Sequence, residues 1–139
     1  MDNLFKHHIE LAIRYGDLDT LGHVNNAKYA TYIEQARVTY VNELGLWDGS
    51  PSEMGLILAR IEIDFKAPLI MADKTVIVWT RCSRLGNKSF DMMHQVVTPS
   101  GKLAATCKAV GVVYNYKHEC TIPMPDDWRK RLIAYEPGL

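Results

Sequence analysis

The chain has 139 residues, 47% of them hydrophobic, with 16 lysines and arginines against 16 aspartates and glutamates. This composition predicts one globular domain over residues 1–139, and a domain of this length buries roughly 70% of the surface of its unfolded chain without disulfides or a structural metal. The formal net charge of zero argues against nucleic acid or an anionic membrane as the main partner, because both attract proteins with a basic surplus.

Cysteine usage and apolar segments indicate the compartment. The three cysteines, Cys82, Cys107 and Cys120, form no CxxC or Cys/His zinc pattern, so we expect no disulfide and no metal site. The N-terminus lacks the apolar region of a signal peptide, and no apolar run approaches 18 residues. The sequence therefore predicts a cytoplasmic protein whose ligand is small.

The first predicted strand covers residues 8–15, where apolar and polar residues alternate. A polar loop follows, and Asn25 then caps a helix predicted over 27–44, which ends before Gly45. This helix is apolar on more than one side, which favours a helix wrapped by other elements. Residues 46–54 carry Gly, Pro and Ser and are predicted to form a loop.

Strands predominate in the rest of the chain. They are predicted over 57–66, 75–83, 89–98 and 102–116, followed by a short helix over 125–133. On the first of these strands, alternation places on one face Ile57, Ala59, Ile61, Ile63 and Phe65. One strand, one long helix and four consecutive antiparallel strands make an α+β fold. Its long edge strands predict pairing with a second copy, as a homodimer or a dimer of dimers.

The densest polar cluster lies between the first strand and the helix, over residues 15–26. The first N–H groups of a helix lack intrahelical acceptors and carry partial positive charge, and a loop before them can bring a carboxylate close. Such an arrangement can polarise a carbonyl oxygen while the carboxylate acts on the carbonyl carbon or on water. Asp and Asn before a helix also serve as simple caps, so the cluster by itself leaves both interpretations open.

The order of residues in this loop favours the catalytic interpretation over a simple helix cap. The stretch from Asp19 to Tyr29, DTLGHVNNAKY, with Tyr32, Glu34 and Arg37 on the helix, closely resembles the hot-dog-fold acyl-CoA thioesterases, in particular the 4-hydroxybenzoyl-CoA thioesterase-like family and its long-chain acyl-CoA relatives. Further segments of the chain, 64–68, 86–90 and Ile122-Pro123, fall where that family has them. The resemblance covers nearly the whole chain.

This resemblance implies a hot-dog fold, in which a long central helix is wrapped by a five- or six-stranded antiparallel sheet. It further implies a dimer with active sites between subunits and hydrolysis of a fatty or aromatic acyl-CoA, with no cofactor beyond the coenzyme A of the substrate. Carried over to this chain, the catalytic carboxylate is Asp19 and the oxyanion-binding amide is the backbone N–H of Asn26. Asp17 is interpreted as a structural or electrostatic neighbour, and His23 as a supporting residue.

Further residues are predicted to contact the substrate. Asn25 caps the helix beside the site, and Tyr29 forms a wall of the pocket. Cations suit the phosphates of coenzyme A, and the candidates for this part of the site are Lys66, Arg84, Lys88 and Ser89. The acyl group is expected among the bulky residues Leu46, Trp47, Met54 and Leu56.

Several alternatives stay open at this stage. Asp19 is either a nucleophile that forms a mixed anhydride or a base that orients water. The acyl group is carried by coenzyme A or by acyl carrier protein. A non-catalytic acyl-CoA sensor and a purely structural dimerisation domain are the other functional classes, but neither accounts for the carboxylate in the polar loop as directly.

Overall fold

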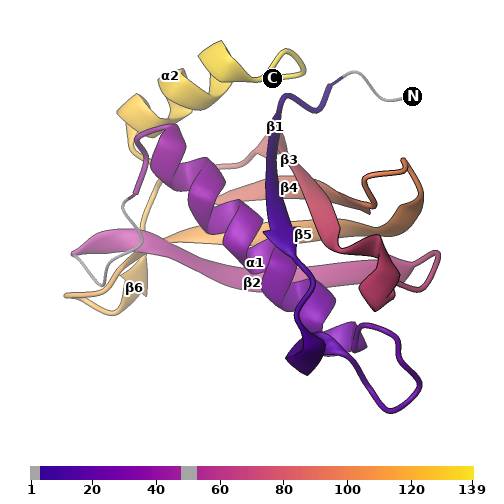
Figure 1. The fold of residues 1–139 in the computed structure, drawn as a ribbon. Helices are drawn as coiled ribbons and strands as arrows, with labels where there is room; N and C mark the ends of the chain where they lie inside the picture. The colour runs from indigo at the N-terminus through magenta and orange to yellow at the C-terminus, as the bar shows by residue number, and fades with distance from the viewer. Residues whose placement is uncertain (1–3, 48–52) are drawn as a thin grey trace.

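A computed structural model describes residues 4–47 and 53–139 (Figure 1). One long helix, α1, crosses one face of an antiparallel sheet, and a second helix, α2, lies at the end of the sheet near both chain termini. In chain order the elements are β1 His7–Ala12, η1 Tyr15–Asp17, α1 Asn26–Glu43, β2 Met54–Phe65, η2 Met71–Asp73, β3 Thr75–Leu85, β4 Ser89–Val97, β5 Leu103–Asn115, β6 Cys120–Thr121 and α2 Asp126–Tyr135. Neither helix in the described ranges is long and apolar enough to cross a bilayer.

The sheet has the strand order β1-β3-β4-β5-β2, with β6 paired to β5, and every pairing is antiparallel. The chain passes from the end of α1 to β2 at one edge of the sheet, whereas β1 forms the opposite edge. The prediction of a long helix wrapped by a five- or six-stranded antiparallel sheet is therefore confirmed.

Asn25 and Gly45, the residues predicted to end α1, do so in the structure. The side chain of Asn25 accepts a hydrogen bond from the backbone N–H of Ala27 at 2.9 Å, which caps the first turn. At the other end, Gly45 adopts a φ of 74°, a left-handed conformation that glycine tolerates best. The helix predicted over 27–44 is thus confirmed within one residue at each end.

The strands differ most from the predictions at three points, and β3 also extends two residues further, to Leu85. β1 ends at Ala12 because the chain turns into η1, where the Asp17 carboxylate accepts the backbone N–H of Arg14. β2 begins at Met54, so the end of the loop predicted over 46–54 is already strand, and residues 48–52 of that loop lie outside the described residues. The two-residue strand β6 was not predicted, since so short a segment has no periodicity to read.

The predicted face of β2 is partly wrong. The register against β5 shifts between Leu58 and Arg60, so Ala59 is an extra residue in a β-bulge. Because paired residues share a face of the sheet, the inner face instead carries Leu56, Leu58, Ile61, Ile63 and Phe65. A one-residue bulge reverses the alternation, and the sequence pattern carries no mark of it.

Two hydrophobic clusters hold α1 on the sheet. The first surrounds the N-terminal half of the helix, where Ile33 and Ala36 are fully buried against β3, β4 and β5. The second surrounds Tyr40 and Val41 and includes Trp128 and Leu132 of α2. The second helix therefore packs at the end of the sheet where α1 terminates, away from the N-terminal end of α1 (Figure 1).

A polar group is buried between α1 and the sheet. His94 on β4 is 1% exposed, and its Nδ1 lies 3.0 Å from Oγ1 of Thr80 on β3. Burial, with the nearby Arg37 charge as a second cause, lowers the pKa of His94 to about 3. His94 is therefore neutral in the folded protein at ordinary pH.

We predict that His94 makes the protein less stable as pH falls from 6.5 towards 3. The unfolded chain takes up a proton with a pKa near 6.5, whereas the folded chain does so only near pH 3, so this contribution is complete above pH 6.5 and is lost below it. Because one group takes up at most one proton, it changes the free energy of unfolding by at most about 1.4 kcal/mol per pH unit. Urea unfolding of the wild type and of His94→Gln between pH 7 and pH 5 measures the difference, and equal slopes would contradict the prediction.

Candidate functional site

The polar loop between η1 and α1 folds back on itself before the helix begins. The backbone N–H of Asn25 donates to the carbonyl of Asp17 at 2.9 Å, Leu18 and Val24 form a β-bridge, and the N–H of Asp19 donates to the carbonyl of His23 at 2.7 Å. The two limbs of the loop are thus joined at three successive levels. This short ladder places Asp19 beside the first turn of α1.

The Asp19 side chain is exposed and braces the tip of the loop. Its Oδ1 accepts the backbone N–H groups of Leu21 at 2.9 Å and His23 at 3.2 Å. Within the described residues no ion pair involves Asp19, and its Oδ2 has no hydrogen-bond donor. One carboxylate oxygen therefore fixes the side chain, and the other is available to a ligand.

The first turn of α1 contains an amide, that of Asn26, without an acceptor among the described residues. The N–H of Asn25 is bonded to Asp17, that of Ala27 to the Asn25 side chain, and that of Lys28 to the Asn25 carbonyl at 2.8 Å. Among residues 4–47 and 53–139, the backbone N–H of Asn26 has no acceptor. This N–H stands at the positive end of the helix dipole and can donate to a carbonyl oxygen on which negative charge develops.

Asp19 and Asn26 line one cavity of about 300 Å³. Its walls are formed by Asp19, His23, Val24, Asn26, Tyr29, Phe65, Lys66, Ala67 and Pro68. The structure thus brings together five of the predicted site residues: Asp19, His23, Asn26, Tyr29 and Lys66. A carboxylate, a free helix amide, an ammonium group and two aromatic rings in one hollow suit a ligand with a polarised carbonyl and an apolar substituent.

Phe65 is a lining residue that the sequence analysis did not place in the site. Its ring meets the edge of the Tyr29 ring at 5.0 Å between centroids, and it is 46% exposed at the end of β2. Burial raises the pKa of Tyr29, which keeps its hydroxyl protonated. The one available signal was the position of Phe65 just before Pro68, where the strand pattern stops.

Asn25 and Asp17 stand apart from this cavity. Asn25 lines a neighbouring hollow of about 670 Å³ on the other side of Asp19, together with Tyr15, Leu18, Thr20 and Gly22. Asp17 is 1% exposed and lines neither hollow, because its carboxylate is turned inward and bonded to Tyr32 and Arg14. Burial would raise the pKa of Asp17, but these hydrogen bonds and the Arg14 charge outweigh it and lower the pKa.

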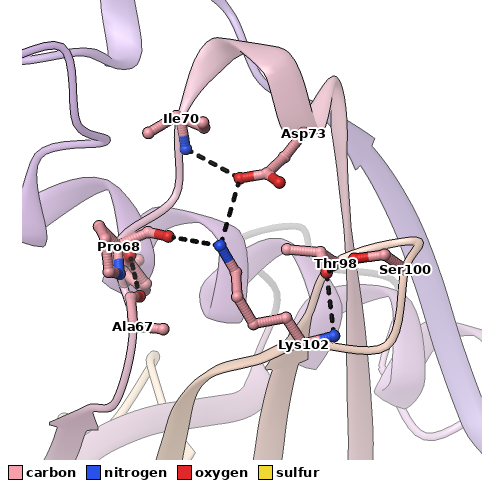
Figure 2. A network of polar contacts seen from close by, with 8 residues as sticks. Ala67, Pro68, Ile70, Asp73, Thr98, Ser100 and Lys102 are labelled. Carbon is pink, nitrogen blue, oxygen red and sulfur yellow. Dashed lines mark hydrogen bonds and ion pairs between the residues drawn. The ribbon is translucent and has the colours of Figure 1, made fainter.

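Lys66, Ala67 and Pro68 form another wall of the cavity, and the segment from Lys66 to Ile70 is held from two sides. On the loop side, the N–H of Val24 donates to the carbonyl of Leu69 at 2.8 Å, and His23 forms a β-bridge with Ile70. On the sheet side, Nζ of Lys102 donates to the carbonyl of Pro68 at 3.0 Å and lies 3.9 Å from Oδ2 of Asp73 (Figure 2). The same Asp73 oxygen accepts the N–H of Ile70 at 2.9 Å, so Lys102 and Asp73 together hold this wall in place.

The predicted phosphate-binding residues Arg84, Lys88 and Ser89 lie on or beside the β3–β4 hairpin, away from the cavity. This hairpin is tied to α2, since Arg129 donates to the carbonyl of Gly86 at 2.7 Å, and α2 packs at the C-terminal end of α1. The 18 residues of α1 span about 27 Å, which separates the hairpin from Asp19 of the same chain. Arg84 is moreover paired with Asp91 at 3.0 Å.

The predicted acyl-pocket residues lie at the same distant end. Leu46 and Leu56 are each 8% exposed and belong to the cluster around Tyr40, with Trp47 and Met54 packed against it. None of these four residues lines the cavity beside Asp19.

Comparisons with known proteins agree on one chemistry. Residues 13–132 match the family model described as the Thioesterase-like superfamily. Long-chain acyl-CoA thioesterase FadM of Escherichia coli is 24% identical over 135 residues, which cover 88% of this chain and 94% of FadM. The chloroplastic acyl-acyl carrier protein thioesterase ATL2 of Arabidopsis thaliana is 38% identical over 65 residues, 45% of this chain and 35% of that protein.

A solved structure is similar over nearly the full length. A thioesterase from Thermus thermophilus, crystallised with coenzyme A and Zn, superposes with a TM-score of 0.83 at 32% identity, covering 97% of this chain and 98% of that one.

We predict that Lys102→Met loosens the cavity wall without unfolding the protein. The change removes the donor to Pro68 and the charge beside Asp73, contacts that are half exposed and worth about 1 kcal/mol or less together. Hydrogen exchange should therefore accelerate a few-fold at the amides of Val24 and Ile70. Lys108→Met, at an exposed lysine of β5, is the matched control, and equal exchange in both variants would contradict the bracing role.

Proposed function

This chain belongs to the thioesterase-like superfamily and hydrolyses thioesters, and we propose that its substrates are fatty or aromatic acyl-CoA thioesters. The observation that carries the proposal is that the Asp19 carboxylate and the unbonded amide of Asn26 line the same cavity. The names of two similar proteins support the carrier, since FadM is a long-chain acyl-CoA thioesterase and the Thermus enzyme holds coenzyme A.

In the proposed reaction the thioester carbonyl oxygen accepts the N–H of Asn26, and the helix dipole stabilises the negative charge that forms on it. Asp19 lines the same cavity and either takes a proton from the attacking water or attacks the carbonyl carbon to give a mixed anhydride that water then cleaves. In both routes the carbon–sulfur bond breaks, and coenzyme A leaves as a thiolate that takes up a proton. Thiolate is a good leaving group, so no strong general acid is required.

The remaining site residues have supporting roles in this proposal. His23 acts through its backbone, which donates to and accepts from Asp19, while Tyr29 and Phe65 contact the acyl group. Lys66 faces the phosphate-bearing side of the ligand. We propose no metal or cofactor besides the substrate's coenzyme A. The free thiols of Cys82, Cys107 and Cys120 are in keeping with a cytoplasmic location.

We also propose that the enzyme is a homodimer, or a dimer of dimers, joined through β2. The outer edge of β2 has no partner strand in the described chain, and its inner face exposes Leu58, Ile61 and Phe65 by 40%, 36% and 46%. An antiparallel pairing of two copies brings the β3–β4 hairpin of one towards the Asp19 loop of the other. The partner then supplies Lys88 and Ser89, with Arg84, to the coenzyme A phosphates.

Acyl carrier protein is the second candidate carrier. The match to ATL2 covers less than half of the chain, but its 38% identity is higher than the 24% identity to FadM. Both carriers present the acyl group on the same pantetheine thiol, so the reaction at Asp19 is unchanged. Assays with an acyl-CoA and the corresponding acyl carrier protein thioester, compared by kcat/KM, separate the two.

We predict that Asp19→Asn lowers kcat by about 100-fold or more on a panel of acyl-CoA thioesters, assayed with a thiol reagent in the presence of EDTA. The amide oxygen can still accept the N–H groups of Leu21 and His23, so the loop keeps its shape while the charge is lost. Asp126→Asn, at an exposed carboxylate of α2, is the control and should retain full activity. Unchanged turnover in both Asp19→Asn and Asp19→Ala would contradict the assignment, and wild-type binding without turnover would favour a sensor.

We predict that Ile61→Glu converts the oligomer to a monomer. The substitution places a charge on the exposed inner face of β2, where the proposed interface excludes water. Gel filtration with light scattering should give the mass of a dimer or tetramer for the wild type and about 15.8 kDa for the variant. Ile133→Glu, on the exposed face of α2, should leave the mass unchanged. A monomeric wild type would contradict the proposed assembly.

A further inference from the structure

A buried side-chain hydrogen bond joins the polar loop to α1. The hydroxyl of Tyr32, on the second turn of α1, donates to Oδ2 of Asp17 at 2.6 Å, and both residues are at most 4% exposed. The backbone N–H of Arg14 donates to the same oxygen at 3.0 Å, and the Arg14 guanidinium lies 3.5 Å from Oδ1. We call Arg14, Asp17 and Tyr32 the clasp.

The clasp sits where the two limbs of the loop meet. Asp17 makes two bonds at this junction. Its side chain accepts the Tyr32 hydroxyl on α1, and its backbone carbonyl accepts the N–H of Asn25, the residue before α1. Asp19 follows Asp17 by two residues, and Asn26 follows Asn25 directly. An extended residue spans at most about 3.6 Å, so neither Asp19 nor Asn26 can move far from this junction.

The clasp has a second effect on the first turn of the helix. Because Asp17 takes up the N–H of Asn25, and the Asn25 side chain takes up that of Ala27, the N–H of Asn26 is left as the unbonded donor in the described first turn. If the Asp17 carbonyl moved away, the Asn25 N–H would become a second free donor, and the cap would be able to rotate. The clasp thus determines both where the carboxylate stands and which amide faces it.

We infer that Asp17 and Tyr32 are positioning residues, which fix the Asp19 carboxylate relative to the Asn26 amide for attack on the thioester. The inference rests on the proposed function, since it takes Asp19 and Asn26 to be the reacting and the polarising groups. Neither Asp17 nor Tyr32 lines the cavity, so in the proposed complex neither contacts the thioester. Their effect is on the geometry of the attack rather than on binding.

The test is the variant Tyr32→Phe, which removes the hydroxyl and keeps the ring. Misplacement of catalytic groups by about 1 Å can cost about 100-fold in rate, so we expect kcat to fall by about 10- to 100-fold with KM changed less than about threefold. The double variant Asp17→Ala/Tyr32→Phe should lose no more activity than Asp17→Ala alone, because Asp17→Ala already removes the acceptor to which the Tyr32 hydroxyl donates.

Tyr40→Phe is the matched control. Tyr40 lies on the same helix and is buried, and its hydroxyl also donates to a buried carboxylate, that of Glu136 at the opposite end of α1. Both variants should lower the melting temperature, but only Tyr32→Phe should lower kcat. Equal loss of kcat in the two variants, or unchanged kcat in Tyr32→Phe, would overturn the inference.

A readout independent of turnover separates this inference from the proposed function. In Tyr32→Phe the amide of Asn25 should exchange with solvent about tenfold faster, whereas in Tyr40→Phe it should exchange as in the wild type. A wild type that cleaves no acyl thioester would contradict the proposed function, even with the exchange rates as expected. Unchanged exchange at Asn25 in Tyr32→Phe would overturn the positioning role, even in an active enzyme.

Discussion

The proposed chemistry of this protein depends on how the first turn of α1 satisfies its backbone N–H groups. A helix leaves these donors without intrahelical acceptors, and here the chain supplies acceptors for the N–H groups of Asn25, Ala27 and Lys28 while the described residues leave that of Asn26 unbonded. Because the same loop carries Asp19, the free amide and a carboxylate face one cavity. The closure of the loop onto the helix thus produces both a stable cap and the candidate site.

The fold determines where this site can stand. The sheet wraps α1 along its length, and α2 closes the end where the helix terminates, with Trp128 and Leu132 packed against Tyr40 and Val41. At the N-terminal end of the helix, the segment from Lys66 to Ile70 is held beside the loop by Lys102 and Asp73 (Figure 2). The core therefore orients the helix, and polar contacts at its N-terminal end hold the walls of the site.

The proposed second subunit follows from the same geometry. The basic β3–β4 hairpin and the Asp19 loop lie at opposite ends of an 18-residue helix, so one chain does not bring them together. The apolar inner face of β2 lies beside a strand edge without a partner strand in the described chain, and a second copy would cover this surface. Pairing there would bring the β3–β4 hairpin of one copy to the Asp19 loop of the other. In this proposal, assembly completes the binding site for the carrier, whereas each chain by itself supplies Asp19 and the amide of Asn26.

The sequence by itself determined what depends on local chemistry. Alternation predicted the strands, and Asn25 and Gly45 predicted the ends of α1. The order of residues from Asp19 to Tyr29 predicted a carboxylate beside a helix amide, and in the structure Asp19 and Asn26 line the same cavity.

Tertiary structure alone decided the rest. The bulge at Ala59 reversed one face of β2, Phe65 joined the cavity because β2 ends beside Tyr29, and Leu46 and Leu56 packed into the core at the far end. The inward turn of Asp17 depends on Tyr32, fifteen residues away, and Lys102 reaches Pro68 across thirty-four. Periodicity and capping depend on residues that are close together along the chain. The bulge, the positions of Phe65 and Asp17 and the reach of Lys102 depend instead on distant segments that the packed core brings into contact.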